Sequence, residues 1–295
     1  MIKLKNLLNE AKQPDYQLTL PLPKCPTRKL IDIFKSKNAS FVSPMKKKEL
    51  DPMECREVTH KLNESVNKVT PYKMYFAICD SNEWKSSEDD GPFSYGEMIS
   101  RDDAYYNREP HIVFYLNSVF FKWLKDKNYD KLYNAFNGTL NHEIVHIHQF
   151  ENKENQDLID FFETFDMRDF MKIMDEGGSS LFKTLRTNPN KVDKKKRGII
   201  AKKYLLNPAE VPAYAYSCVV GMCGKLHETE DLTAEECRNE VRSMINNADK
   251  HKKKCKTLEL FNGFIQSENK AKYNKFISLC NDYLNELDIS YFDKY

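Results

Sequence analysis

The segment that most constrains the fold is LNHEIVHIHQFEN, at 140–152, where polar side chains recur at helical spacing. At about 100° per residue, an α-helix places His146 roughly 40° from His142. Measured from His142 in the same way, Gln149 lies at roughly −20° and Glu143 at roughly 100°. The apolar side chains fall on the opposite side: Tyr133, Phe136, Leu140, Ile144 and Ile147. This pattern predicts an amphipathic helix whose apolar side is buried in a core and whose histidines face a cleft.

Two imidazoles four residues apart on one helix face are a common arrangement of metal ligands. His148 points away from that face, so it is not counted as a ligand. Gly138, one turn before His142, leaves space on the ligand side for substrate or for another backbone. The alternative is a polar surface patch, because the pattern fixes only three positions. The correct amphipathic phase, an upstream apolar segment and a downstream carboxylate favour the metal site.

Three downstream carboxylates compete as the third ligand: Glu163, Asp166 and Glu210. Asp166 and Glu163 lie in a stretch with acidic residues every three or four positions, which is typical of a solvated helix face. Glu210 is the one charged residue of YLLNPAEVPAYAYS, at 204–217, and a buried charge needs a partner. Pro208 suits the first turn of a helix, which would place Glu210 one turn in. We therefore predict Glu210 as the ligand and keep Asp166 as the alternative.

Composition favours a soluble globular protein without a membrane-spanning helix. The chain has 295 residues, 31% of them charged and 40% hydrophobic, and its net charge of +2 provides no general attraction for nucleic acid or membrane. The eight cysteines include no Cys-x-x-Cys pair, so free thiols in a reducing compartment are expected. No signal peptide and no apolar run long enough to cross a bilayer is present, which predicts a cytoplasmic location.

The rest of the sequence predicts an α+β fold. Apolar runs at 72–80 and 111–117 predict strands, and the polar, turn-rich residues 81–97 favour an exposed loop or hairpin. A proline-rich segment at 14–27 should run extended. Helices are predicted at 1–12, at 27–37 with Thr27 as the cap, at 53–69, 119–127 and 153–176, and in two or three segments of 233–295. We predict three regions: an N-terminal extended and helical region at 1–70 packed on the core, the core at 71–220, and a C-terminal helical region at 221–295.

The His-Glu-x-x-His pattern at 142–146, together with the later Glu210, resembles the gluzincin group of zincin metallopeptidases. The resemblance covers two stretches, 137–152 and 204–217. The pairing of His-Glu-x-x-His with the later Pro-x-Glu-x-x-Ala-Tyr-like stretch is also similar to small peptidases, some of phage origin. The chain departs from the thermolysin pattern in its long gap before the glutamate and in lacking a further histidine for the oxyanion. The resemblance implies a zincin-like catalytic core with a small sheet and an active-site helix, flanked by additional helices.

The same resemblance implies Zn²⁺ as the cofactor, held by His142, His146 and Glu210, with a fourth position for water. Glu143 would then be the general base that takes a proton from the water and passes it to the leaving amine. A strand at 111–117 would form the edge of the cleft and pair with an extended substrate. Tyr214 or Tyr216 could donate to the oxyanion, although both can equally be core residues. Asn141 and Gln149 could orient the substrate or the histidines.

These patterns favour a zinc metallopeptidase that acts on peptide or protein substrates. The alternative is a catalytically silent zincin-like structural protein, such as a virion or assembly component, although the intact Glu143 favours catalysis. An amphipathic helix at 1–12 could dock on the protein itself or on a protein partner. The basic run at 191–203 lacks interleaved aromatic residues, so nucleic-acid binding is the least favoured function.

Overall fold

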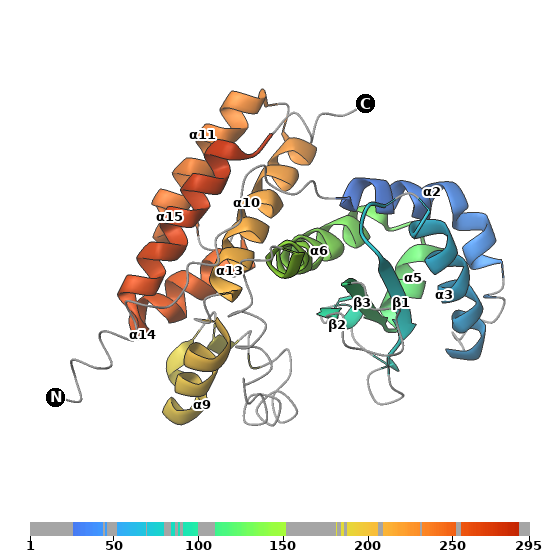
Figure 1. Ribbon diagram of the computed structural model, residues 1–295, viewed down its shortest axis with the longest axis horizontal. Helices are drawn as coiled ribbons and strands as arrows, with labels where there is room; N and C mark the ends of the chain where they lie inside the picture. The colour runs from blue at the N-terminus through green and yellow to red at the C-terminus, as the bar shows by residue number, and fades with distance from the viewer. Residues whose placement is uncertain are drawn as a thin grey trace. The chain divides into compact units, whose positions relative to one another are not determined.

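The structure is a computed structural model, and it describes residues 26–43, 45, 52–68, 70–79, 84–85, 88, 91–99, 110–151, 181, 184–185, 188–205, 209–230, 232–251 and 255–288 (Figure 1). Several predictions concern residues outside these ranges: the helices at 1–12 and 153–176, most of the segment 14–27, Glu163 and Asp166. Among the described residues, no helix is both long enough and apolar enough to cross a membrane.

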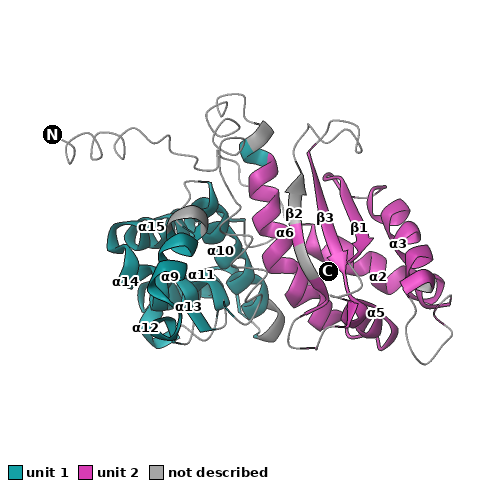
Figure 2. Ribbon diagram, turned by 90° about the horizontal axis from the view of Figure 1, so that it is seen from below, with its two compact units in different colours: residues 1–22, 148–295 teal, residues 23–147 magenta. Residues whose placement is uncertain are grey.

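The chain forms two compact units, one of residues 23–147 and one of residues 148–295 with 1–22 (Figure 2). Neither break coincides with the boundaries near residues 70 and 220 that we predicted from the sequence. The unit at 23–147 includes both the strands and the helices that precede them, because their apolar faces share one buried cluster.

The unit at 23–147 contains a three-stranded sheet in the order β1-β3-β2. Its strands are β1 (Met74–Ile78), β2 (Phe93–Ile99) and β3 (His111–Leu116). The central β3 pairs in parallel with β1 and antiparallel with β2. With helices making up most of the described chain, this small sheet agrees with the predicted α+β class.

Two strands were predicted correctly and one was missed. Strand β2 begins inside the segment 81–97, where we predicted a loop or hairpin, because the polar and glycine residues of FSYGEMI interrupt its apolar alternation. The prediction that the strand at 111–117 forms the edge of a cleft is wrong. Both sides of β3 are occupied by neighbouring strands, so it has no free edge for a substrate.

The outer edge of β1 is closed by two asparagine side chains. Asn63, on α3 (Pro52–Val66), donates to the carbonyl of Phe76 at 3.1 Å and accepts from its N–H at 2.6 Å. Asn67 makes the same pair of bonds to Met74, at 2.7 and 2.8 Å. Each side chain imitates the backbone of a neighbouring strand, so these positions of β1 have their hydrogen bonds satisfied.

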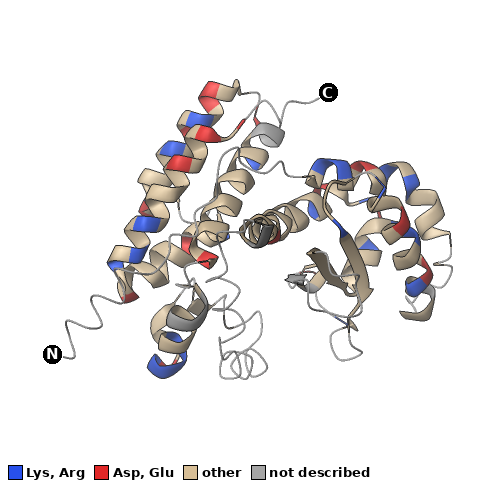
Figure 3. Cartoon of the chain, in the orientation of Figure 1, with Lys and Arg blue, Asp and Glu red and all other residues tan. Residues whose placement is uncertain are grey.

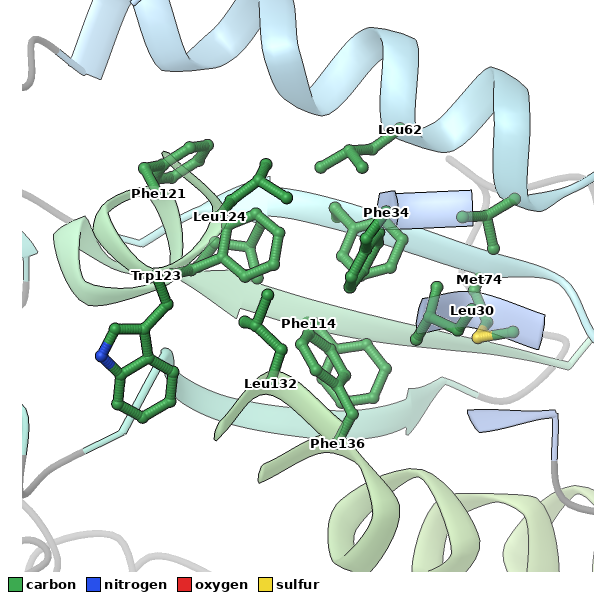
Figure 4. Packing of buried hydrophobic residues seen from close by; sticks show 14 of the residues in the cluster. Leu30, Phe34, Leu62, Met74, Phe114, Phe121, Trp123, Leu124, Leu132 and Phe136 are labelled. Atoms are coloured by element: carbon green, nitrogen blue, oxygen red, sulfur yellow. The ribbon is translucent and has the colours of Figure 1, made fainter. Parts of the chain in front are cut away.

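Helices α2 (Thr27–Val42), α3, α5 (Ser118–Lys125) and α6 (Tyr129–Glu151) complete this unit. In one aromatic core, Phe136 of α6 contacts both Phe34 of α2 and Phe114 of β3, with the Phe136 and Phe114 ring centroids 4.9 Å apart (Figure 4). The helix predicted at 27–37 is confirmed but longer, and its N-cap is Pro26 rather than the predicted Thr27. Asn117 caps α5 by accepting from the Val119 N–H at 3.0 Å.

The described part of the other unit is helical. Its elements are η2 (Pro189–Lys191), α9 (Lys194–Ile199), η3 (Ile200–Leu205), α10 (Glu210–Thr229), α11 (Ala234–Asn246), α12 (Ala248–His251), α13 (Lys256–Leu260), η5 (Phe261–Ile265), α14 (Gln266–Glu268) and α15 (Lys270–Glu286). Helix α10 packs on α11 and α15. Thr233 and Glu236 form a capping box that starts α11, as its S/T-x-x-E spacing favours. Phe261 stacks on Phe276 with ring centroids 4.0 Å apart.

Candidate metal centre

Helix α6 turns its apolar side toward the core, as predicted. Its apolar residues Phe136, Leu140 and Ile144 are fully buried in the core beside the sheet. The histidines lie on the other side of the helix and are also covered, with His142 8% and His146 6% exposed. Burying two imidazoles is costly unless they have partners, so their burial together indicates a specific role.

The two imidazoles point at each other. The Nε2 atoms of His142 and His146 are 3.1 Å apart, and the ring planes are nearly perpendicular at 84°. Two nitrogens bound to one tetrahedral zinc ion at about 2.0–2.1 Å would be about 3.3 Å apart. The observed separation is therefore close to the one that a shared ion requires.

Glu210 brings a third potential ligand atom to the two imidazoles. It is the first residue of α10 and is 7% exposed. The ligand atoms of His142, His146 and Glu210 all lie within 4.8 Å of one another. Between Glu210 and Lys225 the helix has no charged residue (Figure 3). This buried group of two imidazoles and one carboxylate could hold a metal ion, as we predicted for these three residues from the sequence.

Helix α10 begins later than we predicted. Glu210 is its first residue rather than one turn in, and Pro208 lies outside the described residues. Pro212 takes the position in the first turn where the missing N–H costs no helical hydrogen bond. The carboxylate thus lies at the N-terminal end of the helix, where the dipole favours a negative charge.

Gln149 connects α6 with the residue before Glu210. Its side chain is 2% exposed, and its Nε2 donates to the backbone carbonyl of Ala209 at 3.0 Å. We had predicted that Gln149 orients the histidines or the substrate, and this bond goes to the backbone residue before Glu210. This acceptor could not be predicted from the sequence, because it lies 60 residues away along the chain.

The remaining candidates lie in different surroundings. Tyr216 is 1% exposed and packs against Tyr283, so the structure places it in the core of its unit. Tyr214 is half-buried, and its ring contacts that of Phe261 in a tilted arrangement with centroids 5.6 Å apart. It shares the side of α10 that carries Glu210, since the two are four residues apart. Asn141 bonds within its own helix, to Asn137.

Glu143 is 7% exposed and is the residue next to His142 on α6. It is not one of the three residues whose ligand atoms come together. Gly138 has open space around it, with nothing within 4 Å of the position that a Cβ would take. No other group of three or more potential ligands comes together within the described part of the chain.

Comparison with known proteins adds no family to these findings. No protein-family model, no curated protein and no solved structure matches the chain.

Proposed function

We propose that the protein is a zinc-dependent metallopeptidase. The observation that carries the proposal is the buried group of His142, His146 and Glu210, with Glu143 beside His142 on α6. Two imidazoles and a carboxylate suit zinc, and three protein ligands leave one position open, as in catalytic rather than structural zinc sites. When bound, zinc would lower the pKa of water to about 7 and polarise a peptide carbonyl.

Glu143 is the residue for the proton transfers. About 100° from His142 on the helix, it lies at the margin of the ligand side and is not needed as a ligand. In the proposed reaction its carboxylate takes a proton from the attacking water and gives it to the nitrogen of the leaving amine. Its burial keeps bulk water from competing for that proton.

The substrate in this proposal is an extended peptide that pairs with β2. Within the described sheet β2 lies at one end, β3 is paired on both sides, and Asn63 and Asn67 close the edge of β1. Strand β2 also approaches the metal helix closely. A Cβ at Gly96 would lie 2.9 Å from the methyl carbon of Thr139, one turn before His142. A peptide added at this edge would run beside α6.

The test is zinc content and peptide hydrolysis of the parent chain and of Glu143→Gln. We expect about one zinc per chain in both proteins, because Glu143 does not bind the metal. We expect hydrolysis of a peptide library by the parent and a loss of about 10²- to 10⁴-fold in the variant. Equal turnover by both would overturn the mechanism. Zinc binding without any hydrolysis by the parent would favour the catalytically silent structural protein.

A further inference from the structure

Two cysteines of the helical unit are in direct contact. The Sγ atoms of Cys218, on α10, and Cys255, directly before α13, are 3.2 Å apart. All the cysteines that the structure describes are free thiols. A disulfide bond is about 2.05 Å long, so the two sulfur atoms need to approach by only about 1.2 Å to form one.

The two thiols differ in access and in freedom to move. Cys218 is 1% exposed and lies within a long helix, so its position is fixed by packing. Cys255 is half-buried, and its backbone is extended, with φ −136° and ψ 124°, ahead of the first turn of α13. Cys255 is therefore the more accessible of the two, and its carbonyl accepts from the Glu259 N–H of α13 at 2.9 Å, so its approach to Cys218 must come from its side chain.

We propose that Cys218 and Cys255 form a dithiol site that is oxidised to a disulfide by low-molecular-weight disulfides. The Cys255 thiolate attacks one sulfur of the reagent, forming a mixed disulfide and expelling one thiolate. Cys218 then loses its proton and attacks the Cys255 Sγ, forming the Cys218–Cys255 bond and expelling the second thiolate. Two protein thiols lose two electrons and two protons, and one reagent disulfide becomes two thiols.

The neighbourhood sets the pH dependence of this step. Contact with the Cys218 thiol and burial raise the pKa of Cys255 well above its usual value. Little thiolate is therefore present at neutral pH. As long as the pH stays below that pKa, each increase of one pH unit raises the thiolate fraction about tenfold. The oxidation should be slow at pH 7 and faster at pH 9. Cys280 also contacts Cys218 and is the competing partner.

The experiment treats the full-length reduced protein with oxidised glutathione at pH 7, 8 and 9, followed by alkylation, digestion without reduction and mass spectrometry. We expect a linked pair of peptides containing Cys218 and Cys255, formed about tenfold faster per pH unit. Cys255→Ser should abolish that pair, and the matched control Cys55→Ser, a buried cysteine of the other unit, should retain it.

Three outcomes would overturn the proposal: no linked peptides in the parent, a dominant Cys218–Cys280 link, or a glutathione adduct that persists on Cys255. The measurement on the parent chain needs no substitution, so poor folding of Cys255→Ser leaves the test intact.

Discussion

At the scale of single residues, Gln149 bonds to the backbone next to Glu210, the proposed third ligand. Replacing it with methionine removes the donor to Ala209 and keeps a similar volume. We expect zinc affinity to fall about 10- to 100-fold, the usual effect of losing a residue that supports a metal ligand. The measurement is a competitive titration of the apoprotein with zinc and a chromogenic chelator.

The control for Gln149→Met is Asn262→Ala. Asn262 is another buried amide, bonded to Asp249 at 2.9 Å and to Tyr273 at 3.0 Å, within the helices α12 to α15. Its loss should destabilise the protein by about 1 kcal/mol and leave zinc affinity unchanged. Equal losses of affinity in both variants would mean that Gln149 acts only through general stability.

Single residues were also where the sequence was most informative. The grouping of Glu210 with the two histidines could be predicted because one charge in an apolar segment must find a partner when it is buried. The two histidines followed from helical spacing alone. The acceptor of Gln149 and the core position of Tyr216 could not be predicted, because both depend on which helices pack together, and that is decided by contacts distant in sequence.

At the scale of elements, the strands could be identified but not ordered. The apolar runs at 72–80 and 111–117 predicted β1 and β3 correctly. Strand order depends on which edges pair, and the missed strand β2 covers the edge of β3 that we had assigned to substrate. The two asparagines at the edge of β1 could not be predicted either. Their side chains make the hydrogen bonds of a neighbouring strand, and single side chains leave no periodic pattern in the sequence.

Replacing glycine with alanine should change the free energy of unfolding in opposite directions at Gly96 and Gly138. A Cβ at Gly96 would lie 2.8 Å from the ring of the fully buried Phe114, so Gly96→Ala should destabilise the protein by about 1–3 kcal/mol. Gly138 lies inside α6 with open space around it, so Gly138→Ala should stabilise it by up to about 1 kcal/mol. Urea denaturation of both variants measures the two free energies. A stabilising Gly96→Ala would contradict the close approach of β2 to α6.

At the scale of the whole molecule, the break between the compact units falls inside α6, between Ile147 and His148. Boundaries predicted from sequence rely on linkers, where composition changes, and no such change occurs within an amphipathic helix. The sequence instead suggested breaks near residues 70 and 220. Helices α2 and α3 nonetheless bury their apolar faces in the same cluster as the strands.

Zinc should raise the stability of the whole folded chain. A metal that binds only the folded state stabilises it by about 2.7 kcal/mol when its free concentration is 100 times the dissociation constant. For a chain of this size that raises the melting temperature by about 4 °C, and a chelator should reverse the shift. Calorimetry with and without zinc measures it. The eight cysteines also bind zinc in the unfolded chain, which reduces the shift, so variants with the same cysteines are the proper comparison.

Glu210→Ala and Asp166→Ala provide that comparison, because both remove one carboxylate and leave every thiol in place. Asp166 lies outside the described residues and is the alternative ligand predicted from sequence. If Glu210 holds the ion with His142 and His146, Glu210→Ala loses the zinc-dependent shift and Asp166→Ala keeps it. The opposite result would move the third ligand to Asp166. It would also leave the burial of the Glu210 carboxylate at the start of α10 without the cation that offsets its cost.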